Sequence, residues 1–254
     1  VASQANRFAV TQDPQALKQM EDALYGLVTL HDVTGIPGFF ARKIEPLQKS
    51  ADGALVVPSD YQVGQGDWSQ FVWKGHLSHD QIVGYLYGLS AAWPYIQNPD
   101  LKAKVRNVAF QIGKHFIDHK EKVQGPGTNL DFYPATIHIE SMPRALSFLS
   151  DKLLPRGGKA MYALQLLKVA SVITGDPIFS QYYQTLLEQK GYGDLIRENS
   201  QGSTEKTVEK YIGVIDVFAR FQAGFVVRAT PDSLRADVAQ NLSHIALYNL
   251  SSLE

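Results

Sequence analysis

The residues best suited to chemistry are concentrated between positions 67 and 81. This stretch holds three aromatic side chains, two histidines and two aspartates, and it contains two of the chain's three tryptophans. Aromatic rings offer flat faces to sugar rings, while carboxylates and imidazoles hydrogen-bond to hydroxyl groups. The pattern favours a carbohydrate or another small polar ligand; the open alternative is that the rings only anchor the segment to the core. With one arginine upstream, the expected ligand contacts are Arg42, Trp68, Trp73, His76, His79, Gln81 and Tyr85.

Asp80 is the first candidate for a catalytic role, because it stands where a helical pattern begins. A helix dipole favours negative charge at its N-terminus, so this carboxylate could act as a base or position water or a sugar hydroxyl. Glycoside hydrolysis needs a second carboxyl group, about 5–5.5 Å away for retention or about 6.5–9.5 Å for inversion. Asp131 and Glu140, on either side of an aromatic segment, are the candidates. Two alternatives stay open: Ser78 or Asp80 only caps the helix, and Glu140 is an ordinary first-turn acid.

Other chemistries are not indicated. His115 and His119 have the spacing of zinc ligands, but they lack the glutamate of the metalloprotease pattern and stand near a helix end, where imidazolium is favoured. The sequence has no cysteine, no Gly-x-Ser-x-Gly, no P-loop and no Gly-x-Gly-x-x-Gly. Glu205 and Glu209 have lysines beside them and fit a solvated helix face. We therefore expect no metal and no cofactor.

The elements that would position these residues are predicted to be helices. Four pairs of a capping residue and a proline mark helix starts, namely Asp13-Pro14, Asn98-Pro99, Asp176-Pro177 and Thr230-Pro231. Apolar residues at helical spacing follow each pair. Further helices are predicted at 82–93, 141–150, 162–173 (closed by Gly175) and 208–219. About eight helices result, whereas strands are suggested only at 54–58 and 136–139.

Residues 41–79 interrupt the helical pattern and are interpreted as a long loop, of the kind that often carries function. Just before it, residues 33–39 are echoed by residues 173–179, which lie 140 positions later. That offset would hold about three helix pairs at the roughly 40–47 residues of helical repeats. The echo therefore favours helical hairpins stacked in series over a four-helix bundle.

The helix start at Asp80 resembles that of a known family. Ser78-His79-Asp80-Gln81-Ile82-Val83-Gly84-Tyr85, followed by Gly88-Leu89, is similar to the Ser-x-Asp-Gln-x-x-Gly-x-x-x-Gly helix start of some (α/α) toroid proteins, among them six-hairpin glycosidases and unsaturated glucuronyl hydrolases. Residues 34–42, 144–146 and 163–176 resemble other segments of such toroids.

This resemblance implies an all-α fold in which helical hairpins form a full or partial (α/α) toroid. In such toroids the N-termini of the inner helices surround a central pocket, and Asp80 would lie there. Six hairpins need twelve helices, so the eight or so predicted from this sequence would form an incomplete ring or belong to a longer chain.

Length and composition limit the number of domains and the classes of function that are possible. Of the 254 residues, 44% are hydrophobic and 19% charged, as in folded proteins, and one domain over 1–254 is expected. A net charge of −1 provides no field that would gather nucleic acid. No run approaches about eighteen apolar residues, so no transmembrane segment is expected. Because it starts at Val1, the sequence fits a processed form or a fragment as well as an entire chain.

The functional expectation is a carbohydrate-active protein, either a glycoside hydrolase or a lyase acting on oligosaccharides. In a hydrolase Asp80 and Asp131 or Glu140 would be acid and base, whereas in a lyase His76 or Tyr85 would abstract the proton. The alternative is a non-catalytic helical module that binds a glycan, a peptide or its own copies through the aromatic loop. A periplasmic or extracellular location is expected, with the cytoplasm left open. The substrate and the oligomeric state are not predicted.

Overall fold

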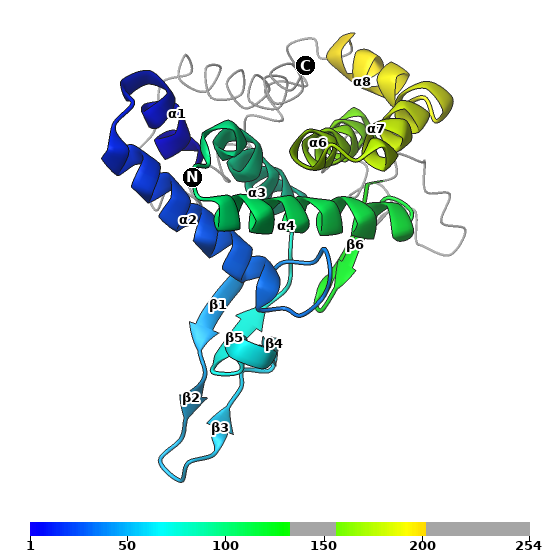
Figure 1. The fold of residues 1–254 in the computed structure, drawn as a ribbon. Coiled ribbons are helices and arrows are strands. Elements are labelled where there is room, and N and C mark those ends of the chain that lie inside the picture. Colours follow the sequence, from blue (N-terminus) through cyan, green and yellow to red (C-terminus); the bar gives the residue numbers. More distant parts are fainter. Residues whose placement is uncertain (133–155, 202–254) are drawn as a thin grey trace, which may run out of the picture. The chain divides into compact units, whose positions relative to one another are not determined.

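The computed structural model describes residues 1–132 and 156–201 (Figure 1). Contacts between residues divide the chain into two compact units. The described part of the first unit comprises residues 1–132 and 162–185, and that of the second comprises 156–161 and 186–201. The described candidate residues discussed below all belong to the first unit.

Seven α-helices are present among the described residues: α1 (Ala2–Thr11), α2 (Pro14–Asp32), α3 (His79–Ala92), α4 (Pro99–Asp118), α6 (Arg156–Thr174), α7 (Pro177–Gln184) and α8 (Tyr192–Gln201). None of the described helices combines the length and the apolar character needed to cross a membrane.

Three of the four predicted pairs of capping residue and proline start helices, which confirms those predictions. At α2, α4 and α7 the side chain of Asp13, Asn98 or Asp176 accepts a hydrogen bond from a backbone N–H of the first turn. Such a bond satisfies one of the N–H groups that have no partner within the helix. The fourth pair and two further predicted helices, namely Thr230-Pro231, 141–150 and 208–219, lie outside the described residues.

Small residues let the helices of the first unit approach closely. At Gly113 of α4, an added Cβ would lie 2.5 Å from the ring of Phe179 and 2.8 Å from the Cβ of Ala170. At Gly88 of α3, an added Cβ would lie 3.1 Å from Leu27 of α2. Gly84, one turn earlier on α3, has nothing within 4 Å of such an atom. Gly88 therefore takes part in close packing, and Gly84 does not.

The segment predicted as a loop forms an antiparallel β-structure, which we call the arm (residues 43–74). Its strands are β1 (Lys43–Pro46), β2 (Gln48–Lys49), β3 (Leu55–Val56), β4 (Tyr61–Val63) and β5 (Phe71–Lys74). The order β1-β5-β4 forms a three-stranded sheet, and β2 and β3 form a separate pair that we call the distal ribbon. In Figure 1 the arm runs out from the end of α2, with the distal ribbon at its far end.

A second hairpin follows α4. Strands β6 (Lys122–Gly125) and β7 (Thr128–Asp131) pair antiparallel, with Gly125 opposite Thr128 across the turn. The residues Gly125-Pro126-Gly127 are typical of a turn, whereas the short strands beside them have no clear sequence signal. Gly127 has a φ of +66°, a conformation that glycine adopts without steric cost.

The prediction of an all-α toroid is wrong. The described residues combine seven helices with three small antiparallel sheets, which is a mixed α and β architecture. The strands have two to four residues each, too few for the alternation of polar and apolar residues that identifies strands in a sequence. Of the two predicted strands, 54–58 contains β3, and 136–139 lies outside the described residues.

The internal echo has a local explanation. Thr34 and Thr174 each donate a side-chain hydrogen bond to a carbonyl of the preceding helix, and each is followed by a glycine with positive φ. After the first of these helix ends the chain leads to β1, whereas after the second it enters α7 directly. The two segments therefore share a way of ending a helix and do not show that hairpins repeat.

Candidate functional site

The start of α3 is fixed by a capping box. Ser78 is the N-cap and forms the box with Gln81, whose side-chain oxygen accepts a hydrogen bond from the Ser78 N–H at 3.1 Å. Gln81 is thereby engaged in the helix start itself. Asp80 lies in the first turn with a half-buried side chain, where a helix dipole stabilises negative charge. The cap is therefore Ser78, and Asp80 is left for another role.

His79 connects the start of α3 to the end of β7. Its Nε2 lies 3.2 Å from the backbone carbonyl oxygen of Asp131. Because a carbonyl can only accept, Nε2 carries the proton and donates this hydrogen bond. The imidazole also packs edge-on against Phe132, with ring centroids 4.7 Å apart, and lies 6.4 Å from the ring of Tyr162. Two of the predicted site residues, His79 and Asp131, are thus in contact.

Tyr162 brings α6 to the same place. Burial raises the pKa of the Tyr162 phenol, and the nearby carboxylate of Asp80 raises it further, so the phenol keeps its proton. The carboxylate of Asp131 lies 3.9 Å from the ammonium group of Lys122 across the β6–β7 hairpin. His79, Asp80, Asp131 and Tyr162, which we call the α3 cluster, therefore meet from α3, β7 and α6.

Gln165 follows Tyr162 by three residues on α6, which places it about one turn further along the same side of the helix. Its side chain is fully buried, and neither its carbonyl oxygen nor its amide nitrogen has a hydrogen-bond partner among the described residues. Leaving a buried polar group without a partner costs about 1–3 kcal/mol, so such a group needs an explanation. A hydroxylated ligand or an ordered water would satisfy both atoms.

Two predicted ligand contacts lie in the core instead. Trp73 of β5 is 2% exposed and packs against Phe39, and its indole N–H has no hydrogen-bond partner in the part of the chain that the structure describes. Tyr85 of α3 stacks on Phe40 with ring centroids 4.0 Å apart, and its hydroxyl donates a hydrogen bond to the carbonyl of Leu27 at 2.8 Å. Burial strongly raises the pKa of the Tyr85 phenol. Both side chains anchor their elements, as the alternative interpretation of the aromatic residues proposed.

Of the other predicted residues, Arg42 and His76 contact each other, and Trp68 lies on the arm. Arg42 is exposed, and its guanidinium donates a hydrogen bond to the backbone carbonyl of His76 at 3.4 Å. His76 is also exposed and has a φ of +53°. Trp68 is half-buried on the arm, with its ring 5.9 Å from that of Phe71. Glu140 lies outside the described residues.

Sequence reasoning missed Tyr162 and Gln165 as site residues. In the sequence, Tyr162 indicates only the beginning of the helix predicted at 162–173. Gln165 offered a signal, because it is the one polar residue in the run Ala163-Leu164-Gln165-Leu166-Leu167. A lone amide within an apolar helix is either paired inside the core or poised for a ligand.

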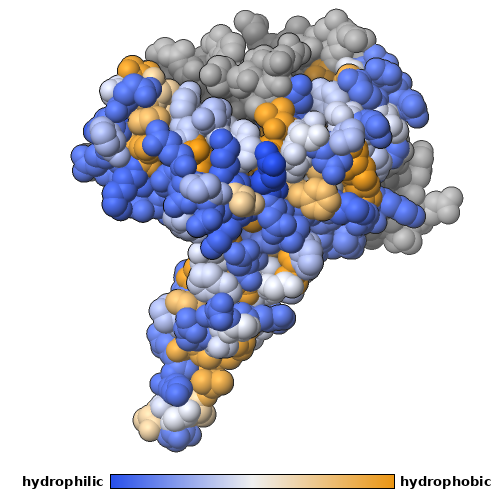
Figure 2. Space-filling model, viewed as in Figure 1, coloured by the Kyte–Doolittle hydropathy of each residue, from blue (hydrophilic) through white to orange (hydrophobic). Residues whose placement is uncertain are grey.

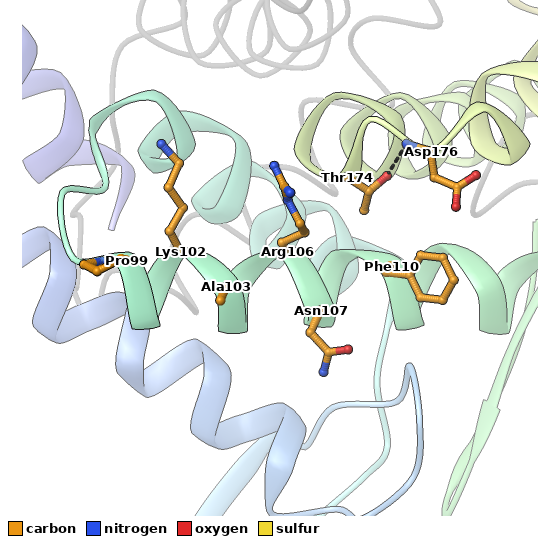
Figure 3. A pocket seen from close by; sticks show the side chains of 8 residues that line it. All are labelled: Pro99, Lys102, Ala103, Arg106, Asn107, Phe110, Thr174 and Asp176. Atoms are coloured by element: carbon orange, nitrogen blue, oxygen red, sulfur yellow. Dashed lines mark hydrogen bonds between the residues drawn. The ribbon is translucent and has the colours of Figure 1, made fainter.

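The first unit also has a hollow that the sequence did not suggest, which we call the α4 hollow (Figure 3). It has a volume of about 560 Å³ and is lined by Pro99, Lys102, Ala103, Arg106, Asn107, Phe110, Thr174 and Asp176. The lining residues come from α4 and from the junction between α6 and α7. None of them had been predicted to bind a ligand.

The histidine pair on α4 is used for structure. His115 donates from Nδ1 to the carbonyl of Pro37 at 3.1 Å and accepts the N–H of Gln124 on Nε2 at 3.2 Å. The imidazole of His119 stacks on that of His115 and bonds to its carbonyl oxygen. In the part of the chain that the structure describes, no group of three or more His, Asp or Glu residues could hold a metal ion.

Comparison with known proteins provides no relative. No family model, no curated protein and no solved structure matches this chain. The resemblance of residues 78–89 to toroid proteins stays a prediction for that segment.

Proposed function

We propose that the first unit binds a carbohydrate at the α3 cluster and acts on it as a glycoside hydrolase or a lyase. The observation that carries the proposal is the meeting of His79, Asp80, Asp131 and Tyr162 from three separate elements. The sequence pattern points to three of these four residues, namely His79, Asp80 and Asp131, for sugar chemistry.

The chemistry of the cluster suits a ligand rich in hydroxyl groups. The carboxylate of Asp80 accepts hydrogen bonds, and the protonated phenol of Tyr162 donates one. The buried amide of Gln165 can do both, and its unpartnered atoms favour a ligand with a donor and an acceptor close together. A small number of placed polar groups beside aromatic rings such as Phe132 is typical of small-molecule sites.

The two reaction types use the cluster differently. In a hydrolase Asp80 and Asp131 would be the two carboxyl groups that flank the glycosidic bond, one donating a proton to the leaving oxygen and the other activating water or attacking the sugar. In a lyase Asp80 would abstract a carbon-bound proton, because Tyr85 is engaged with Leu27 in the core.

The test is Asp80→Asn, assayed against a panel of neutral and acidic oligosaccharides with product detection by mass spectrometry. We expect the wild type to cleave at least one member, and the variant to lose about 10²-fold or more of that activity. The matched control is Asp100→Asn, because Asp100 is likewise the first-turn acid of a helix that starts with a side-chain cap. Asp100→Asn should leave turnover unchanged.

Two results would contradict the proposal. One is the absence of both cleavage and saturable binding for every oligosaccharide tested with folded wild-type protein. The other is an equal loss of activity in Asp80→Asn and Asp100→Asn, because that result would indicate a general effect on helix starts. Circular dichroism of both variants separates loss of folding from loss of turnover.

A second candidate function is a non-catalytic module that associates with its own copies through the arm. Leu55 and Val56 in the distal ribbon are 57% and 47% exposed, and Figure 2 shows apolar surface along the arm. A two-stranded ribbon has two open edges, which are templates for pairing with another chain. Sedimentation of wild type and Val56→Lys tests this candidate: a dimer that dissociates in the variant supports it, and a wild-type monomer at about 100 μM rejects it.

A further inference from the structure

Helix α4 carries basic side chains that pair with aromatic rings instead of acids. The ammonium group of Lys102 lies 5.1 Å from the ring centroid of Trp93, and the guanidinium of Arg106 lies 5.7 Å from it. In residues 1–132 and 156–201, neither side chain has a carboxylate within 4.0 Å. Trp93 thus lies beside two positive charges that no acid of the described residues pairs with.

This arrangement has an energetic cost that a ligand would remove. Lys102 and Arg106 are four residues apart on α4, so the two like charges are neighbours on one face and repel each other. Stacking on Trp93 holds both side chains in place and reduces the entropy lost when a ligand binds. An anion between them would form charge-assisted hydrogen bonds with both.

Both cations line the α4 hollow. Figure 3 shows Lys102 and Arg106 rising from the same side of α4, with Thr174 and Asp176 facing that helix from the junction of α6 and α7. The Thr174 hydroxyl accepts the N–H of Asp176, and the carboxylate of Asp176 accepts the N–H of Ile178. The carboxylate of Asp176 keeps its negative charge while it caps α7, so two positive charges and one negative charge line the hollow.

The hollow also offers an apolar surface. Phe110 is 37% exposed, and its ring is fixed edge-on by the buried Phe179 at a centroid distance of 5.6 Å. A rigid, partly exposed aromatic ring about one turn from a cation suits a flat apolar group attached to an anion. The volume of about 560 Å³ falls in the range of roughly 300–1,000 Å³ that is usual for small-molecule sites.

We propose that the α4 hollow binds a small organic anion, in which a carboxylate or phosphate contacts Lys102 and Arg106 and a flat ring packs against Phe110. The site is separate from the α3 cluster, and its occupancy does not depend on any activity there. A nucleic acid is a poor fit, because the net charge of the chain is −1 and this patch is confined to one helix face.

Binding is tested by calorimetric titration of the full chain with phenyl phosphate, inorganic phosphate and benzyl alcohol, which separate the contributions of ring and charge. We expect saturable binding of phenyl phosphate, binding of inorganic phosphate that is weaker by about tenfold, and no binding of benzyl alcohol. Raising the salt concentration should weaken the binding of both phosphates.

Substitutions of residues that line the α4 hollow test whether phenyl phosphate binds there. Lys102→Gln and Arg106→Gln should each weaken phenyl phosphate by about tenfold, because each removes one charge-assisted contact. Lys104→Gln is the matched control: it makes the same charge change on the same helix, but Lys104 lies near the ring of Tyr25, 5.9 Å away, and does not line the hollow. Phe110→Ala should reduce the affinity for phenyl phosphate to that for inorganic phosphate.

Three outcomes would overturn the proposal. The first is no saturable binding of phenyl phosphate at millimolar concentration. The second is an equal effect of Lys104→Gln and Arg106→Gln, which would show non-specific attraction to a basic helix. The third is an unchanged preference for phenyl phosphate in Phe110→Ala. Unfolding curves of each variant confirm that the protein titrated is folded.

Discussion

The base of the arm and its distal ribbon differ in how their side chains are protected. At the base, Val72 and Trp73 of β5 are 2% exposed, and β5 is paired on both sides. In the distal ribbon, β2 and β3 pair through two residues each, and Leu55 is 57% exposed. Two-stranded ribbons on their own are marginal in water. The base should therefore open only when the first unit unfolds, whereas the distal ribbon opens locally at a small free-energy cost.

The largest expected effect is that of Trp73→Ala. Removing this buried ring leaves a cavity beside Phe39 and should lower the free energy of unfolding by about 3–5 kcal/mol. Val56→Ala in the distal ribbon should change it by less than about 0.5 kcal/mol, because Val56 is already 47% exposed. Urea denaturation measures the free energy of unfolding of both variants. It should be followed by far-UV circular dichroism, because Trp73→Ala also changes the tryptophan fluorescence.

Trp73→Phe sharpens this test. It keeps most of the apolar volume and also removes an indole N–H that is buried without a partner. It should therefore cost much less than Trp73→Ala. Similar losses for Val56→Ala and Trp73→Ala would show that the ribbon and the base unfold together, and the contrast between them would be wrong.

A pair of glycines gives the next largest contrast. Gly38 has a φ of +75°, and an added Cβ would lie 2.2 Å from the backbone oxygen of Gln111. Gly38→Ala should thus cost about 1–2 kcal/mol for the left-handed conformation and about 1–3 kcal/mol more for the overlap. Gly53, in the turn of the distal ribbon, has a φ of +85° but nothing within 4 Å of such an atom.

Gly53→Ala therefore costs only the conformational strain, and its effect on global stability is limited further by local opening of the ribbon. We expect less than about 1 kcal/mol in urea denaturation, together with faster hydrogen exchange confined to residues near the turn. A larger global loss for Gly53→Ala than for Gly38→Ala would contradict this order.

The same contrast explains which parts of the fold could be predicted. Capping residues mark helix starts in the sequence. Asp13, Asn98 and Asp176 each cap the helix that the sequence predicted there. The arm gives no comparable signal, because its pairing is non-local: Lys43 pairs with Lys74 across more than two dozen intervening residues. Strands of two to four residues cannot display a period of two, so a β-structure was interpreted as a loop.

In the candidate site, too, the local signals were predictable from the sequence and the non-local contacts were not. Residue types and a helix start pointed to His79 and Asp80, and both lie in the α3 cluster. Tyr162 is contributed by α6, far along the chain, and only tertiary packing brings it to the cluster, while Gln165 follows it about one turn later on the same helix. Trp73 and Tyr85 have the same residue types as sugar-stacking groups, but burial decides their role, and burial depends on contacts with Phe39 and Phe40.

The smallest expected effect concerns pH and acts at the turn beside the base of the arm. His115 links the 37–38 turn to β6, because it donates to the Pro37 carbonyl and accepts the N–H of Gln124. Burial lowers the pKa of His115, and the neighbouring His119 lowers it further, although the bond to Pro37 and the charge of Asp118 oppose this. The folded protein thus favours the neutral imidazole.

Between the unfolded-state pKa of about 6.5 and the lower folded-state value, the unfolded chain binds more protons than the folded one, so stability rises with pH. The contribution of the neutral His115 imidazole to stability is complete above pH 6.5. It is lost as the pH falls through this window. We therefore expect lower urea midpoints at pH 5.5 than at pH 7.5, and a smaller difference between the two in His115→Gln. His119→Gln, which keeps both backbone contacts of His115 but removes the charge that lowers its pKa further, should reduce the difference less than His115→Gln does.

The distal part of the arm should not share this pH dependence. The Ser50 hydroxyl holds the pKa of Asp52 below its usual value, and Lys74 does the same for Asp60. Both carboxylates are therefore still ionised at pH 5.5, which lies below the ordinary pKa of an imidazole. Hydrogen exchange at that pH, corrected for the intrinsic rate, should show lost protection at Gln124 and no change around Asp52. Loss of protection around Asp52 first would mean that acid acts on the ribbon, and the link between His115 and the base would then be wrong.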